Sequence, residues 1–176
     1  MRKFIKFIII MIILLAVCLY GLKDIFPLEH RELVEKYSNE YSVDKNLIYA
    51  VIKAESNFST DAVSHVGASG LMQLTDDTAY WISQKIGDDS FSIENISDPE
   101  TNIKYGVWYL KYLENELSDP DLVIMAYNAG INNVRSWIND KKISADELKI
   151  QDIPYRETKI YLTKVKTYRK IYELIY

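Results

Sequence analysis

Glu55 stands where a helical pattern ends and a polar segment begins. Asp44 can cap a helix whose apolar residues share one face, and Ser56 and Asn57 directly follow the glutamate. A carboxylate at a helix C-terminus meets the negative end of the helix dipole, which disfavours its charged form and raises its pKa. If a cleft also shields it from water, it can hold the proton that a general acid in glycoside cleavage must donate. On position alone, an exposed glutamate without a chemical role is the competing interpretation.

Three further segments contain residue types suited to binding a sugar. Ser64 to Leu74 reads SHVGASGLMQL, Ala126 to Gly130 reads AYNAG, and Pro154 to Tyr161 reads PYRETKIY. A glutamine amide offers a donor and an acceptor to hydroxyl and N-acetyl groups, and a tyrosine ring can stack on a sugar face. Because the chain has 14 tyrosines, the motifs carry the information and no single tyrosine does.

With Ala54-Glu55-Ser56, and in this order, these segments resemble the soluble lytic transglycosylase (SLT) family of the lysozyme-like superfamily, which is related to goose-type lysozymes. The resemblance extends over residues 41–168 and implies a lysozyme-like, all-α fold. It also implies that Glu55 is the single catalytic residue. In that family the glutamate protonates the glycosidic oxygen between N-acetylmuramic acid and N-acetylglucosamine, and then takes a proton from the muramic C6 hydroxyl as a 1,6-anhydro ring closes. The internal hydroxyl has a high effective concentration, so a second carboxylate to activate water becomes unnecessary.

The resemblance further implies a set of substrate contacts. The matching positions are Ser56, Ser64, Met72, Gln73, Tyr127, Asn128, Glu157 and Tyr161. Two of them keep a structural alternative: Met72 suits an irregular gap in the core, and Glu157 could make structural hydrogen bonds. The resemblance implies that no cofactor is needed. The chain has two histidines and no Cys/His cluster, which argues against a structural zinc site. His65 is expected to be a loop residue.

Two other functions fit the same motifs. A goose-type lysozyme has an equivalent glutamate but hydrolyses the bond, and a non-catalytic wall-binding module would keep the cleft without needing a protonatable Glu55. The sequence departs from the family pattern at Thr75 to Thr78, where relatives commonly have a proline. This departure changes how the next helix can begin and leaves the catalytic positions untouched.

Helices must position these segments. Apolar spacing and start signals predict a helix through residues 33–41, one from Asp44 to about Ser56, one from Thr75 to Ile86, one starting at Asp98-Pro99, one from Asp119-Pro120 to Gly130, and one after Pro154. A polar loop is expected between residues 56 and 70. No segment shows strand-like alternation, so the domain is predicted to be all-α.

An apolar segment precedes this domain. Arg2, Lys3 and Lys6 lie before an uncharged stretch from Phe7 to Leu22. We expect an uncleaved signal-anchor helix in the membrane, with the domain on the extracytoplasmic side according to the positive-inside rule. A cleaved signal, which would leave a secreted protein, and lipid attachment at Cys18 are the alternatives.

The expected organisation is therefore an anchor or signal over residues 1–22, a connector over 23–29 and the catalytic domain over 30–176. Of 21 basic and 25 acidic residues, four and two lie before residue 30, which leaves 17 against 23 in the domain. This acidic balance excludes nucleic acid as an expected partner. The expected partners are peptidoglycan strands and a membrane, and the sequence does not indicate any division, sporulation or secretion machinery.

Overall fold

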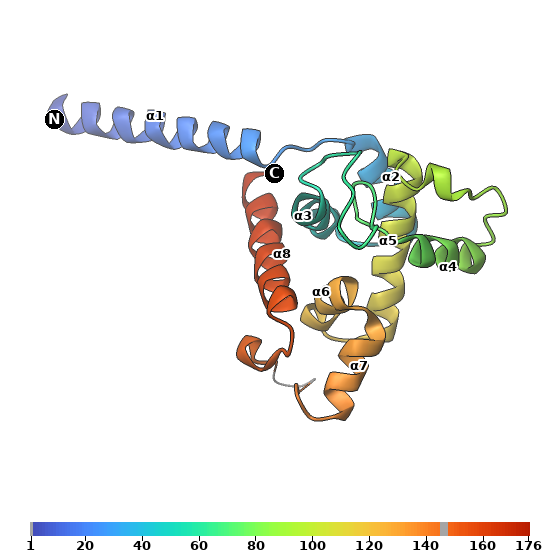
Figure 1. Cartoon of the computed structure of the whole chain (residues 1–176). Helices are drawn as coiled ribbons and strands as arrows, with labels where there is room; N and C mark the ends of the chain where they lie inside the picture. The colour runs from blue at the N-terminus through green and yellow to red at the C-terminus, as the bar shows by residue number, and fades with distance from the viewer. Residues whose placement is uncertain (1, 145–147) are drawn as a thin grey trace.

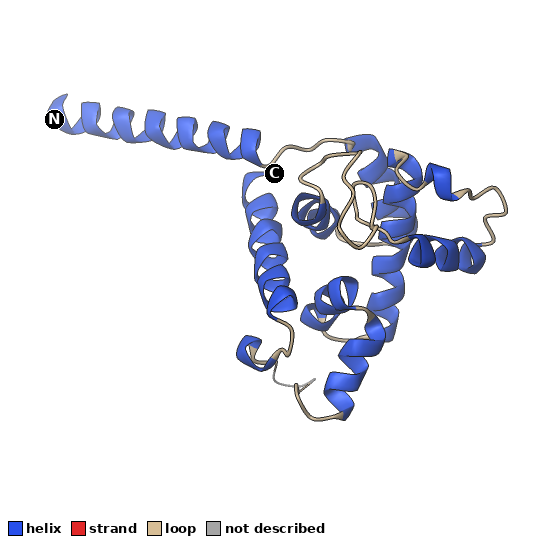
Figure 2. Ribbon diagram, in the orientation of Figure 1, coloured by secondary structure: helices blue, strands red, loops and turns tan. Residues whose placement is uncertain are grey.

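The computed structural model describes residues 2–144 and 148–176. Within these ranges it contains α-helices and short 3-10 helices and no β-strand, which confirms the predicted all-α class (Figure 2). The elements are α1 (Arg2–Ile25), α2 (Arg31–Tyr41), α3 (Lys45–Glu55), α4 (Asp76–Ile86), η1 (Ile93–Asn95), α5 (Pro99–Glu116), α6 (Pro120–Ala129), α7 (Ile131–Asn139), η2 (Ile150–Asp152) and α8 (Arg156–Ile175).

Side-chain caps start α3, α4, α5 and α6 where the sequence predicts a helix to begin. Asp44 accepts a hydrogen bond from the Asn46 amide, and Asp98 and Asp119 cap α5 and α6 in the same way, with a proline at the first helical position of each. Thr75 caps α4 by accepting from the Thr78 amide. The missing proline is thus replaced by a threonine cap, which satisfies one of the unpaired amides at the helix start.

The main core lies where α2, α3, α5, α6 and α8 meet. Helix α3 packs against α8, and α8 packs against α6, so helices far apart in sequence lie side by side (Figure 1). Ile48 and Ile52 of α3, Leu110 of α5, and Leu162 and Val165 of α8 have no exposed surface. Full burial of one such side chain stabilises the fold by about 2 kcal/mol, and here it also fixes α3 against α8.

A smaller apolar cluster joins α4 to α5. Its buried members are Leu74, Ala79, Ile82, Ile96 and Tyr105. The cluster holds α4 and the segment before it against one face of α5. The polar loop between α3 and α4 is thereby fixed at the end that leads into α4.

Helix α7 was not predicted. We expected the chain to leave the helical state at Gly130, yet Gly130 has a φ of 83° and lies between two helices, as the C-cap of α6 and the N-cap of α7. A glycine tolerates this left-handed backbone, so the chain turns sharply and begins a new helix. Val134 and Trp137 then bury the inner face of α7.

Helix α1 extends away from the remaining helices (Figure 1). The segment directly after α1 is held near the C-terminus of the chain, where the Tyr176 hydroxyl donates to the Phe26 carbonyl at 2.9 Å and the Tyr172 hydroxyl donates to the Pro27 carbonyl at 3.2 Å. In the described part of the chain, no helix is both long enough and apolar enough to cross a membrane. The prediction of a membrane-spanning N-terminal helix is therefore not supported.

Candidate active site

Glu55 is the last residue of α3, as the sequence predicted. The start of α3 is fixed by the Asp44 cap, and Asp44 also accepts a hydrogen bond from Arg169 of α8 at 2.8 Å. At the other end, the Ser56 hydroxyl donates to the Leu71 carbonyl at 2.8 Å. Both ends of the helix are thus tied to other elements, which holds the Glu55 backbone in place.

The Glu55 carboxyl lies among groups that act on its charge in opposite directions. Its pKa is raised to about 7, mainly by burial and to a smaller extent by the negative charge of Glu157. The Tyr161 hydroxyl donates to Glu55 Oε1 at 2.7 Å, and this bond and the positive charge of Lys164 lower the pKa. Lys164 is fixed by donating to the Ala54 carbonyl at 2.8 Å. Near neutral pH the carboxyl is therefore present in both protonation states, as a group that gives and then takes a proton requires.

Two cavities meet at Glu55. The first, of about 410 Å³, opens toward the loop between α3 and α4, and the second, of about 480 Å³, opens toward α8. Glu55, Asn128 and Glu157 line both cavities. An extended ligand that occupied both cavities would pass directly over the Glu55 carboxyl.

The loop between α3 and α4 forms one wall of the first cavity. Ser64 lines it while accepting a hydrogen bond from the Ala68 amide at 3.0 Å. Gln73 also lines it, and its side-chain nitrogen donates to the Ala62 and Gly70 carbonyls, each at 2.9 Å. Because the loop uses both N–H groups of this amide, Gln73 has only its amide oxygen left for a ligand.

The AYNAG segment ends α6 and connects the loop to α8. The Tyr127 hydroxyl donates to the Met72 carbonyl at 2.9 Å, and burial raises the pKa of Tyr127 well above its usual value. Asn128 Oδ1 accepts from the hydroxyl of Thr158, a buried residue of α8, at 2.8 Å. Both side chains line the first cavity and are held by these bonds.

The structure does not bring every predicted contact residue to a cavity. Ser64, Gln73, Tyr127, Asn128, Glu157 and Tyr161 each line at least one of the two cavities. The Met72 side chain is fully buried, in agreement with the alternative of core packing. Ser56 lines neither cavity, and its hydroxyl is used by the Leu71 and Ile52 carbonyls.

Carboxylates are the acid–base side chains that line both cavities at this site. Glu55 and Glu157 are the carboxylates that line the two cavities, and Glu157 is the more exposed of the two. Over residues 2–144 and 148–176, no group of three or more His, Cys, Asp or Glu side chains is arranged to hold a metal ion.

The family model for the transglycosylase SLT domain matches residues 32–150, which is well over half of the chain. The chain belongs to the transglycosylase SLT family. The match covers α2 to α7, with Glu55, the loop and the AYNAG segment. Helix α8, which brings Glu157 and Tyr161 to the site of this SLT domain, lies beyond the matched residues.

Curated relatives of the SLT domain carry related names. The soluble lytic murein transglycosylase of Escherichia coli (strain K12) is 31% identical over an alignment of 154 residues, which covers 86% of this chain and 24% of the relative. The membrane-bound lytic murein transglycosylase C of Photorhabdus laumondii subsp. laumondii is 35% identical over 164 residues, covering 80% of this chain and 45% of the relative.

Solved structures have the same fold. The 70 kDa soluble lytic transglycosylase of Escherichia coli superposes with a TM-score of 0.80 at 31% identity, over 87% of this chain and 25% of that one. An inactive Glu-to-Gln mutant of the lytic transglycosylase Slt from Pseudomonas aeruginosa gives 0.79 at 34% identity, over 87% and 25%. The chain thus spans about a quarter of the length of these proteins.

Residues that the sequence analysis missed hold the SLT site together. Asn102 has no exposed surface; it accepts from the Met72 amide at 2.7 Å and donates to the Ser69 and Ile96 carbonyls at 2.9 and 2.7 Å. A polar residue beside Ile103 in an apolar stripe was the available signal. Thr158 lies in the PYRETKIY segment but was not assigned a role, and Lys164 gave no signal, because the partners of both lie far away in sequence.

Proposed function

We propose that this SLT domain is a peptidoglycan lytic transglycosylase, which cleaves the bond between N-acetylmuramic acid and N-acetylglucosamine and leaves a 1,6-anhydro end. The observation that carries the proposal is the Glu55 carboxyl, which lies between two cavities with a pKa of about 7 and accepts a hydrogen bond from Tyr161. The names of the relatives, lytic murein transglycosylases, support the same activity.

In the first step, protonated Glu55 donates its proton to the glycosidic oxygen. The bond from this oxygen to C1 of the muramic sugar breaks, and its electron pair stays with the departing N-acetylglucosamine. Positive charge develops at C1 while Glu55 becomes a carboxylate. The Tyr161 hydroxyl and the Lys164 ammonium stabilise that carboxylate, because both favour its charged form.

In the second step, the C6 hydroxyl of the muramic sugar attacks C1. Glu55 takes the hydroxyl proton as the new C–O bond forms, so the enzyme regains its starting state and no water is consumed. A reacting hydroxyl within the same sugar needs no second carboxylate to position it. We assign Glu157 to substrate positioning, since it lines both cavities and is exposed.

The remaining residues that line the cavities are proposed to bind the sugars on either side of the cleaved bond. Gln73 would offer its amide oxygen to an N–H or hydroxyl group, and Tyr127 and Asn128 would form the opposite wall. Ser64 lines the same cavity. Ser56 and Met72 are assigned a supporting role, because their contacts are made within the protein.

Product analysis tests the reaction. Purified peptidoglycan is digested with the domain, and the fragments are examined by mass spectrometry. We expect muropeptides whose muramic end is lighter by one water than the hydrolysed form, as an anhydro ring requires. Fragments with only reducing muramic ends would assign the domain to the hydrolytic, goose-type reaction, and an undigested substrate would favour a binding module.

We also propose that α1 brings the domain to a membrane and that the domain acts outside the cytoplasm. The support is a row of exposed apolar side chains on α1, among them Phe4, Phe7 and Met11, together with the membrane-bound name of one group of relatives. Fractionation of cells that produce the full chain or residues 30–176 tests this. We expect only the full chain in the membrane pellet, and equal partitioning of both proteins would contradict the proposal.

A further inference from the structure

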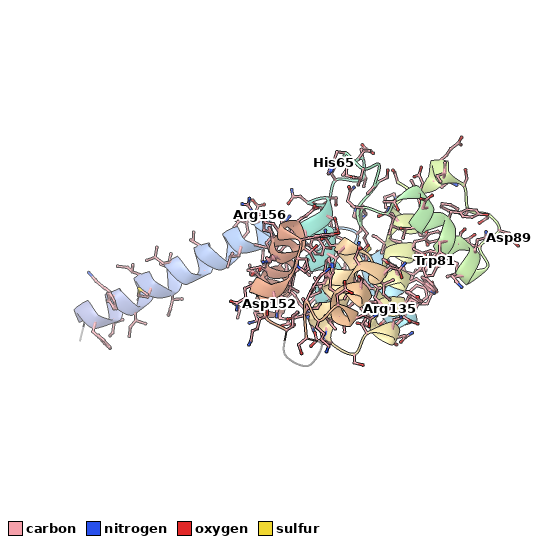
Figure 3. The ribbon with its side chains drawn as sticks, turned by 60° about the horizontal axis from the view of Figure 1, so that its bottom comes forward. His65, Trp81, Asp89, Arg135, Asp152 and Arg156 are labelled. Carbon is pink, nitrogen blue, oxygen red and sulfur yellow. The ribbon has the colours of Figure 1, made fainter. Side chains whose placement is uncertain are left out.

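The segment directly after α1 packs into the main core beside α8. Phe26, the first residue of this segment, is only 6% exposed. Its ring lies edge-on to two tyrosines of α8, with 5.2 Å between the ring centroids for Tyr168 and 5.6 Å for Tyr172. Figure 3 shows that α1 joins the domain on the side of α8, opposite Trp81 and Asp89. Phe26 therefore belongs to the same packed core as α8.

The backbone of this segment is held as well as its ring. The carbonyls of Phe26 and Pro27 each accept a hydrogen bond from a tyrosine hydroxyl near the C-terminus of the chain. The Lys23 ammonium, in the last turn of α1, lies 4.9 Å from the centroid of the Tyr176 ring. These contacts fix where Phe26 meets α8.

Tyr168 connects Phe26 to a cation beside the active site. The Lys164 ammonium, one helical turn before Tyr168 on α8, lies 5.8 Å from the centroid of the Tyr168 ring, at which distance the two attract one another. The same ammonium donates to the Ala54 carbonyl at 2.8 Å, and its positive charge favours the charged form of Glu55. A continuous series of contacts thus runs from Phe26 through Tyr168 to Lys164.

Phe26 also contacts α3 directly. The Lys53 ammonium lies 5.4 Å from the centroid of the Phe26 ring, and Lys53 precedes Glu55 by two residues. Burial lowers the pKa of Lys53, and the positive charge of Lys164 lowers it further. Two cations therefore lie near the C-terminus of α3, where the helix dipole attracts both. Because these cations repel one another, the aromatic ring beside each helps to keep it in place.

We propose that Phe26 is a positioning residue of the active site, which holds the Tyr168 ring and thereby keeps the Lys164 ammonium beside Glu55. The proposal rests on the proposed function, and the series of contacts from Phe26 to the Ala54 carbonyl carries it. Phe26 lies before the residues that the family model matches. A cation that moves away stabilises the Glu55 carboxylate less, so proton donation to the glycosidic oxygen becomes slower.

Other titratable side chains line a cavity with Glu55. Besides Lys164 they are His65, Tyr109, Tyr127, Arg156, Glu157 and Tyr161. In the part of the chain that the structure describes, the ring contacts of Phe26 lead to Lys164 and to none of these six. Loss of the Lys164 charge raises the Glu55 pKa. A merely structural loosening would admit water and lower that pKa, because burial is the main cause of its raised value.

Titration of Glu55 in the full chain tests the proposal without relying on catalysis. The signal of the Glu55 carboxyl carbon is followed by NMR as the pH is varied, and kcat on peptidoglycan is measured alongside. We expect Phe26→Ala to raise the Glu55 pKa and to lower kcat about fivefold. Ile175→Ala, at a residue of α8 that is 7% exposed, controls for lost packing and should leave both quantities unchanged.

Two further variants show whether Lys164 carries the effect. Tyr168→Leu removes the ring beside Lys164 at a partly exposed position, so it serves if Phe26→Ala does not fold, and it should also raise the Glu55 pKa. Lys164→Met removes the charge itself and should raise this pKa at least as much. Phe26→Ala should add nothing in the Lys164→Met background, whereas additive increases would overturn the proposal.

The proposal and the proposed function can fail separately. An unchanged or lowered Glu55 pKa in both Phe26→Ala and Tyr168→Leu would overturn the positioning role, while cleavage by the wild type would leave the proposed function intact. A wild-type chain that does not cleave peptidoglycan would contradict the proposed function, and the NMR titration would still decide whether Phe26 holds Lys164 beside Glu55.

Discussion

The Tyr161 hydroxyl donates a hydrogen bond to Glu55 Oε1 across 2.7 Å and joins two residues that are 106 positions apart in the chain. Burial raises the Glu55 pKa, and this bond opposes that increase. Together with the charges of Lys164 and Glu157, these two effects leave the Glu55 pKa at about 7. Helix α8 thus sets the proton affinity of a residue on α3.

Tyr161→Phe should move the pH dependence of cleavage to higher pH. The change removes a bond that favours the charged carboxylate, so the Glu55 pKa rises above about 7 and the acid stays protonated further into the alkaline range. The pH profile of kcat/KM on purified glycan strands measures this. Tyr155→Phe, at an exposed tyrosine that lines neither cavity beside Glu55, is the control, and equal profiles for both variants would contradict the assigned bond.

Glu55 should also make the stability of the domain depend on pH. Its pKa is raised from 4.5 to about 7, so the folded state binds the extra proton and the contribution to stability is complete below pH 4.5 and lost as the pH rises through 7. Glu55→Gln lacks this loss and should be more stable than the wild type above pH 7, by about 3 kcal/mol.

Urea unfolding of both proteins at pH 4.5 and pH 8 checks this difference. The two free energies of unfolding should be closer at the lower pH than at the higher one. A constant gap between the proteins at both pH values would show that the Glu55 carboxyl titrates in the folded protein as it does in the unfolded chain.

Local sequence patterns predicted the position of Glu55, whereas the residues around it were assigned through the family resemblance. The end of α3 follows from a local cap and a local periodicity, so the helix terminus at Glu55 was predictable. Tyr161 was assigned only through family resemblance, because no spacing shows that α8 packs on α3. For Met72 the sequence allowed two interpretations, packing in the core or contact with the substrate. Its complete burial depends on Gly106, where a Cβ would lie 2.4 Å from the Met72 sulfur.

The loop that forms the first cavity should be sensitive to the side chain at Gly70. Gly67 and Gly70 have φ values of 81° and 78°, so alanine is strained at both. At Gly67 a new Cβ has no neighbour within 4 Å, whereas at Gly70 it would lie 2.4 Å from Asn102 Nδ2. Gly67→Ala should lower the free energy of unfolding by about 1 kcal/mol, and Gly70→Ala by about 3 kcal/mol.

Chemical denaturation of the two variants, with activity measured alongside, tests this difference. Asn102 cannot move aside easily, since it holds three hydrogen bonds to the loop and to Ile96. Gly70→Ala should therefore also reduce cleavage. Equal destabilisation by the two substitutions would mean that Asn102 does not brace the loop as described.

Several helix starts were predictable from local caps, whereas α7 was missed because its start has no side-chain cap. Asp98 and Asp119 act through amides in the next turn, so each start is visible in a short stretch of sequence. Gly130 was interpreted as a stop signal, yet a glycine with positive φ also permits a turn directly into another helix. The apolar spacing of Ile131, Val134 and Ile138 was the signal for α7 that the Gly130 interpretation overrode.

The most direct test of the central claim is the rate of glycan cleavage by Glu55→Gln compared with Glu157→Gln. Both substitutions neutralise a carboxylate that lines the same two cavities, but only Glu55 is assigned the proton transfers. Glu55→Gln should lower kcat by at least about a hundredfold while glycan binding persists, and Glu157→Gln should act mainly on KM. Cleavage by Glu55→Gln at close to the wild-type rate would show that another group moves the proton.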